Sequence, residues 1–230
     1  MFFFDPTYLL FMAPAFLLMM ITTWYVNSAY RKWSQVPARS GMTGVQAAQR
    51  LITAGGLFGV QIEGVAGKLT DNYDPRTKTL HLSQNVGQNA SVASLAVAAH
   101  ELGHAQQDAE GYFPLRFRAA LVPMVNIGSY LGWILILVGL LLNFTQLAWL
   151  GVAVFAGGAL FALATLPVEL NASARAKRLL AETGIINGDD EQRGVNTVLN
   201  AAALTYVAAL VTAILQLLYY ATLVGGRRRR

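Results

Sequence analysis

The chain contains no cysteine, few charged residues and only three histidines. Without cysteine there is no disulfide bond and no thiolate metal ligand, which excludes a disulfide-stabilised scaffold and cysteine-based zinc sites. Charged residues make up 13% of the 230 residues and hydrophobic residues 55%. Because soluble domains usually contain about 25% charged residues, this composition indicates a membrane protein.

Long uncharged stretches show where the chain crosses a membrane. Charge is absent over 25 residues (6–30), 50 residues (119–168) and 33 residues (194–226). One helix needs about 20 apolar residues to cross a bilayer, so the middle stretch holds two spans, divided at the polar cluster 143–146. We therefore predict transmembrane helices near residues 7–28, 120–142, 147–167 and 200–223. The pair Gly157–Gly158 predicts close helix packing.

These spans divide the chain into five segments. Residues 1–30 lack the basic start of a signal peptide, so we expect a transmembrane anchor that is retained. Residues 31–118 form the juxtamembrane segment, 119–168 a transmembrane hairpin, 169–199 a helix and loop, and 200–230 a last helix with a basic tail. The aromatic residues that flank the first span predict a belt at the membrane interface. They are Trp24, Tyr25, Tyr30 and Trp33.

The juxtamembrane segment combines helix and strand patterns. Thr43 is a predicted N-cap for a helix through residues 45–52, which ends at 54–56. Alternating apolar residues predict a strand over 60–65, turn chemistry follows at 70–76, and 79–83 is expected to return as the second strand of a hairpin. A further helix is expected over 91–108. The predicted fold is therefore a mainly α membrane protein with about four transmembrane helices and a small α+β juxtamembrane segment.

The sequence His100-Glu101-Leu102-Gly103-His104 lies in the last of these helices. Residues four apart share one helix face, so both imidazoles can hold one metal ion. Catalytic zinc sites take three protein ligands and leave one position open. Glu101 lies about 100° around the helix from His100, out of reach as a ligand but placed to take a proton from water. The motif predicts hydrolysis of peptide bonds with one zinc ion per chain.

The third ligand is predicted from topology. Two spans return the chain to the side of the membrane where the motif lies, and the first charge met there is Glu169. Its carboxylate would complete a His₂Glu site. Glu169 also fits an interfacial residue paired with Arg175 or Arg118. Asp108 and Glu110 are weaker candidates, because the motif helix would have to break to bring them to the metal.

Four segments carry a family resemblance: residues 69–76, 91–106, 167–176 and 202–207. In this order they resemble the bacterial YugP-like membrane neutral zinc metallopeptidases, over nearly the whole chain. The resemblance implies a gluzincin-type site in which His100, His104 and Glu169 bind zinc and Glu101 is the base. It also implies a multi-pass protein of the bacterial cytoplasmic membrane. More distantly, the chain is similar to HtpX and CAAX-type proteases.

Two positions depart from these patterns. The YugP-like family usually has a histidine where this chain has Asn72, so a substrate-binding role there is weakened or passes to an amide. HtpX-type proteins have an aspartate four residues after the ligand glutamate, where this chain has Ser173. Without that carboxylate, another group must orient the zinc-binding histidines.

Further polar residues are candidates for binding substrate or for stabilising the oxyanion that forms when water attacks a carbonyl group. Asn196, Asn200 and Tyr206 lie at the mouth of the fourth span, although Tyr206 fits a packed aromatic residue equally well. His81 is expected to face away from Leu80 and Leu82, in a structural or surface role.

Basic residues indicate the orientation. Nine lie in 31–118 and four in 167–200, on the side of the motif, against four in 227–230. The positive-inside rule then places the site in the cytoplasm, although the terminal arginines argue for the opposite. The expected partners are the lipid bilayer and peptide or membrane-protein substrates, with no nucleic acid. A homo-oligomer or a complex partner is left open. The alternative function is a catalytically silent zinc scaffold or a partner in a protease complex.

Overall fold

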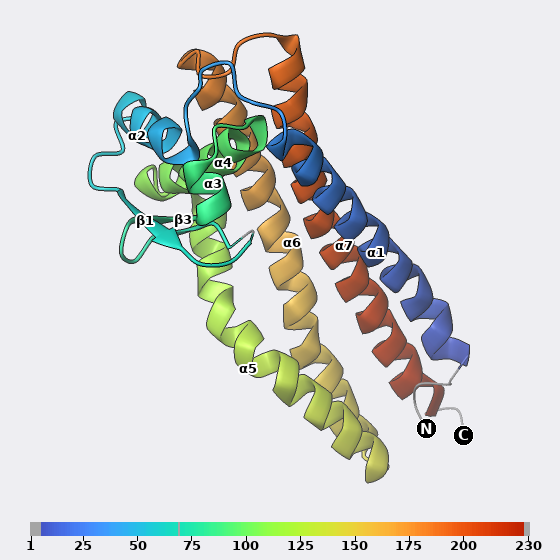
Figure 1. The fold of residues 1–230 in the computed structure, drawn as a ribbon. Helices are drawn as coiled ribbons and strands as arrows, with labels where there is room; N and C mark the ends of the chain where they lie inside the picture. Colours follow the sequence, from blue (N-terminus) through green and yellow to red (C-terminus); the bar gives the residue numbers. More distant parts are fainter. Residues whose placement is uncertain (1–5, 69, 228–230) are drawn as a thin grey trace. The chain divides into compact units, whose positions relative to one another are not determined.

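The computed structural model describes residues 6–68 and 70–227 (Figure 1). Its elements, in chain order, are α1 (Pro6–Ser34), α2 (Gly44–Ala54), β1 (Gln61–Val65), β2 (Asn72–Asp74), β3 (Thr79–Ser83), α3 (Gln84–Gln88), α4 (Val92–Ala109), α5 (Phe113–Leu141), α6 (Thr145–Glu182) and α7 (Asp189–Arg227). The protein is mainly helical with a small three-stranded sheet, which confirms the predicted fold class.

Within the described ranges, α1, α5, α6 and α7 are long and apolar enough to cross a membrane. They match the four predicted spans but extend beyond them. The clearest extension is α6, which continues through Pro167 to Glu182. The residues after this proline are mostly Ala, Leu, Arg and Lys, which favour a helix. Residues 169–182 are therefore the continuation of α6 rather than a separate helix.

The chain forms two compact units. Unit 1 combines residues 1–22, 116–167 and 205–230, and unit 2 combines residues 23–115 and 168–204. In unit 1, α5 and α6 run antiparallel, side by side (Figure 1). Glycines allow this contact: a Cβ atom at Gly139 would lie 2.4 Å from the backbone of Ala148, and one at Gly151 would lie 2.6 Å from Ile136. Small residues allow helix backbones to approach closely in membranes.

The prediction for Gly157–Gly158 was wrong. A Cβ atom at either position would have no neighbour within 4 Å. The glycines of α5 and the start of α6 make the close contact instead, because they lie next to the connection between the two helices. That connection is at the predicted place, with Asn143 in the left-handed region at φ 52°.

The sheet of unit 2 has the strand order β1-β3-β2. Residues 61–65 and 79–83 are strands, but they pair in parallel, so the antiparallel pairing expected between them was wrong. The hairpin is formed by β2 and β3, through the turn at 75–78, where Lys78 has φ 53°. Strand β2 has only three residues and lies within the segment 70–76 that was predicted to be a turn. Consequently β2, not β3, is an edge strand.

The helices of unit 2 begin where their caps predict. Thr43 and Gln46 form a capping box at the start of α2, and Ser91 caps α4 by accepting a hydrogen bond from the backbone N–H of Ser94. Leu80 and Leu82 of β3 point into the same core as α2 and α4, and they are 0% and 1% exposed. Burying such side chains contributes about 1.5–3 kcal/mol each.

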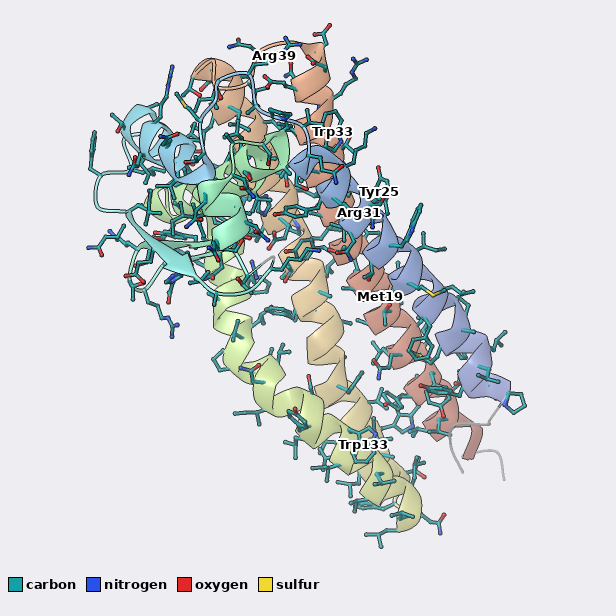
Figure 2. All side chains as sticks on the ribbon, in the orientation of Figure 1. Met19, Tyr25, Arg31, Trp33, Arg39 and Trp133 are labelled. Carbon is teal, nitrogen blue, oxygen red and sulfur yellow. The ribbon has the colours of Figure 1, made fainter. Side chains whose placement is uncertain are left out.

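The last part of α1 also belongs to unit 2, and Figure 2 shows Tyr25, Arg31 and Trp33 on it. Trp24 and Tyr25 are exposed, as an interfacial belt requires. In contrast, Tyr30 lies in the core. Trp33 packs closely against Gly194 of α7, since a Cβ atom at that glycine would lie 2.5 Å from the Trp33 ring. The predicted belt was therefore wrong for Tyr30, which is buried against protein, whereas Trp33 is partly buried.

Helix α4 meets α6 through Gly103, within unit 2. A Cβ atom at Gly103 would lie 2.4 Å from the backbone oxygen of Ala172. Real Cβ atoms essentially never approach so closely, and a backbone atom cannot move aside as a flexible side chain can. Glycine at this position therefore sets the distance between the two helices.

Replacing Gly103 with alanine is expected to destabilise the protein. Alanine gains about 1 kcal/mol in helix propensity over glycine, but overpacking against a fixed backbone costs about 1–3 kcal/mol. We expect a lower thermal unfolding midpoint for the detergent-solubilised protein. The matched control is Gly157→Ala on α6, where the added methyl group meets nothing and stability should hold or rise. A Gly103→Ala protein as stable as the Gly157→Ala protein would contradict the close contact.

Candidate metal centre

Three side chains of unit 2 meet between α4 and α6. His100 and His104 lie one turn apart on α4, with ring centroids 4.9 Å apart. Glu169 of α6 is 3% exposed, and its Oε2 atom lies 3.3 Å from His100 Nε2 and 3.4 Å from His104 Nε2. Among the described residues, this trio is the group of His, Asp and Glu side chains that fits one ion.

The donor atoms suit zinc in kind and in spacing. Two imidazole nitrogens and one carboxylate oxygen are a frequent catalytic set. In a tetrahedral site with bonds of about 2.0–2.1 Å, neighbouring donor atoms lie about 3.3 Å apart. The two N–O separations of 3.3 and 3.4 Å match this value. The residues therefore fit the ion that the motif implies.

Glu101 follows His100 on α4 and is partly buried. Burial raises the pKa of its carboxyl group above the usual value, and the nearby imidazoles oppose this rise. Burial favours the neutral acid because a charged carboxylate is poorly solvated there. Such a carboxylate is a stronger proton acceptor than an exposed one, which suits a general base.

The second ring nitrogen of each histidine also has a partner. Ser173 Oγ lies 3.2 Å from His100 Nδ1, and Gln107 Oε1 lies 3.0 Å from His104 Nδ1. Both Nδ1 atoms are thus engaged, which leaves both Nε2 atoms facing Glu169. The sequence left open which group orients the histidines in the absence of an aspartate at position 173. In this structure, Ser173 and Gln107 are the groups that contact and orient the two histidines.

The charged neighbours of the site pair with one another. Arg175 binds Glu110 through two contacts of 2.7 Å, and this guanidinium holds the pKa of the Glu110 carboxyl below its usual value. Asp108 accepts a hydrogen bond of 3.0 Å from Tyr73. Asp108 and Glu110, the weaker ligand candidates, are thus engaged with Tyr73 and Arg175.

The other candidate residues of unit 2 have contacts of their own. Asn72 is exposed on β2 and pairs with His81 of β3, which faces away from the core and lies 3.7 Å from Glu63. Asn200 accepts a hydrogen bond from Lys177, and Asn196 lines a small hollow beside the same lysine. Tyr206 belongs to unit 1.

Gln107, Asn171 and Arg175 are polar residues around the site whose roles the sequence did not reveal. Helix periodicity could have identified Gln107, because it lies three residues after His104 and therefore on the same side of α4. Asn171 and Arg175 are four residues apart on α6. Their meeting with α4 spans more than 60 residues of sequence, which spacing alone does not predict.

Comparisons with known proteins agree with the site. The family model described as "Putative neutral zinc metallopeptidase" matches residues 8–225. The curated protein described as "Putative membrane protease YugP", from Bacillus subtilis (strain 168), is 44% identical over 195 residues, covering 85% of this chain and 86% of that protein. No solved structure matches the chain. The resemblance noted in the sequence is confirmed, and the chain belongs to this family of neutral zinc metallopeptidases.

Proposed function

We propose that this protein is a membrane zinc metallopeptidase that cleaves peptide bonds near the membrane surface, with one zinc ion per chain. His100, His104 and Glu169 are the proposed ligands, and Glu101 is the proposed general base. The observation that carries the proposal is the meeting of one carboxylate oxygen with two imidazole nitrogens at 3.3 and 3.4 Å. Glu101 lies beside this cluster without being part of it.

When bound, zinc would supply Lewis acidity, which lowers the pKa of water and polarises the substrate carbonyl group. Glu101 removes a proton from the attacking water. It then delivers that proton to the leaving amine, so the carboxylate is regenerated in each cycle. Burial assists the first step, because a carboxylate whose pKa is raised accepts a proton more readily.

We propose that an extended peptide binds along the edge strand β2. Main-chain hydrogen bonds to a strand edge hold a peptide without reading its sequence. The Tyr73 hydroxyl fixes this edge to α4 by donating to Asp108, which lies four residues after His104. Asn72 is exposed on the same strand, so its amide is a candidate for contact with substrate.

The setting of the site supports substrates at the membrane surface. Helix α4 ends at Ala109 and α5, a candidate membrane helix, begins at Phe113. We propose that residues 31–118 are the catalytic segment and that they face the cytoplasm, because basic residues are enriched in the segments on that side. The substrates would then be peptides or membrane-protein segments that reach this surface. Asn196, Asn200 and Tyr206 remain candidates for oxyanion stabilisation.

Replacing Glu101 with glutamine tests the proposed base. Glutamine keeps the size of the side chain but cannot accept the proton, so we expect hydrolysis of casein by the solubilised protein to fall at least about 100-fold. Zinc content should be unchanged. The matched control is Glu182→Gln, an exposed carboxylate on α6, which should keep full activity. Unchanged hydrolysis in the Glu101→Gln protein would rule out Glu101 as the base, and no zinc-dependent hydrolysis by the unaltered protein would favour a silent zinc scaffold.

Replacing Glu169 with alanine tests the proposed third ligand. The two histidines alone hold zinc weakly, so we expect the purified protein to lose most of its metal, measured by elemental analysis after dialysis against a weak chelator. The Glu182→Gln protein again serves as the control and should retain about one zinc per chain. Full zinc content in the Glu169→Ala protein would show that the ion lies elsewhere.

A further inference from the structure

Behind His104, a series of polar side chains links α4 to α6. Gln107 is 0% exposed, and its amide nitrogen donates to the backbone oxygen of Val168 at 2.8 Å and to Asn171 Oδ1 at 2.9 Å. Asn171 Oδ1 also accepts from Arg175 Nε at 2.7 Å. A buried amide with every polar atom engaged is costly to disturb, because each unpaired group costs about 1–3 kcal/mol.

The direction of each hydrogen bond in this series is fixed. A backbone carbonyl group only accepts, so the amide nitrogen of Gln107 must face Val168 and its oxygen must face His104. An arginine Nε atom only donates, so Asn171 must turn its oxygen toward Arg175. The oxygen of Gln107 therefore accepts a hydrogen bond from His104 Nδ1–H. In a neutral imidazole, this leaves the lone pair on Nε2, the atom that faces Glu169.

The far end of the series is held by charge. Arg175 forms two contacts of 2.7 Å with Glu110, the residue that follows α4. The guanidinium also lies 5.8 Å from the ring centroid of Tyr112. The series thus starts on α4 at His104, crosses to α6 and returns to the end of α4. Glu169 lies on α6 between Val168 and Asn171, so the same contacts set its position along α4.

The partner of His100 does not have a fixed hydrogen-bond direction. A serine hydroxyl both donates and accepts, so Ser173 satisfies His100 Nδ1 in either tautomer. Among the described residues that contact the two imidazole rings at Nδ1, only Gln107 has a fixed hydrogen-bond direction.

We propose that Gln107 is a positioning residue that keeps the proton of His104 on Nδ1 and aligns α6 so that Glu169 meets His104. This rests on the proposed zinc site, since it describes how one of its ligands is oriented. Partners of this kind around metal ligands affect metal affinity by about 10–100-fold. Their usual form is a carboxylate or a backbone carbonyl, whereas here an amide is used.

The test compares two substitutions in the full-length protein. Gln107→Met keeps the length of the side chain but removes the acceptor, and Gln107→Glu keeps an acceptor for His104. The first readout is the ¹⁵N-histidine NMR signal of the His104 Nδ1–H group in zinc-free protein, which three histidines keep resolvable. The second readout is zinc affinity, measured by competition with a chelator.

We expect Gln107→Met to lose the Nδ1–H signal and to bind zinc about 10–100-fold more weakly. Gln107→Glu should keep the signal and lose less than about tenfold in affinity. Equal losses in both proteins would show that Gln107 only clamps the helices, and no loss in either would show that it has no role. Either result overturns the proposal.

A second pair covers the case in which neither Gln107 variant folds. Asn171→Asp keeps the acceptor for both Gln107 and Arg175, whereas Asn171→Leu removes it. We expect only the leucine variant to weaken zinc binding and the Nδ1–H signal, and equal behaviour would contradict the proposal. Neither readout involves hydrolysis. A wild-type protein that cleaves nothing, with variants that behave as expected, would refute the peptidase function alone.

Discussion

The site depends on the close approach of α4 and α6 at Gly103. A methyl group at this position would overlap the backbone of Ala172, so no larger residue fits without moving a helix. The approach lets a carboxylate on α6 reach two imidazoles on α4, and it buries that carboxylate almost completely. A buried, uncompensated carboxylate is costly, and here two imidazole nitrogens lie against it. The geometry that brings the helices together therefore also creates the demand for positive charge.

The partners of the outer histidine nitrogens are neutral. Ser173 and Gln107 contact the outer nitrogens of the histidines, and neither adds charge. The charged pair of Arg175 and Glu110 lies at a partly exposed position. Because the three proposed ligands include one anion, zinc and these ligands alone would carry a single net positive charge, with the carboxylate of Glu101 beside them. That charge is suited to attracting an electron-rich carbonyl oxygen.

The sequence predicts the parts of this protein that depend on local chemistry. The length of the uncharged stretches predicts the four apolar helices. The four-residue spacing of His100 and His104 predicts that they share a helix face. It does not predict β2, because three residues lack a readable alternation. It also does not reveal that α6 continues past Pro167, since proline usually marks a helix end. The bonds from Gln107 to Val168 and Asn171 join distant segments and become visible only in the fold.

The most direct measurement of the central claim is zinc K-edge X-ray absorption on the purified, metal-loaded protein. The account predicts a four-coordinate ion with nitrogen and oxygen ligands at about 2.0–2.1 Å and outer-shell scattering from two imidazole rings. Six oxygen neighbours, or the scattering of fewer than two imidazole rings, would contradict it.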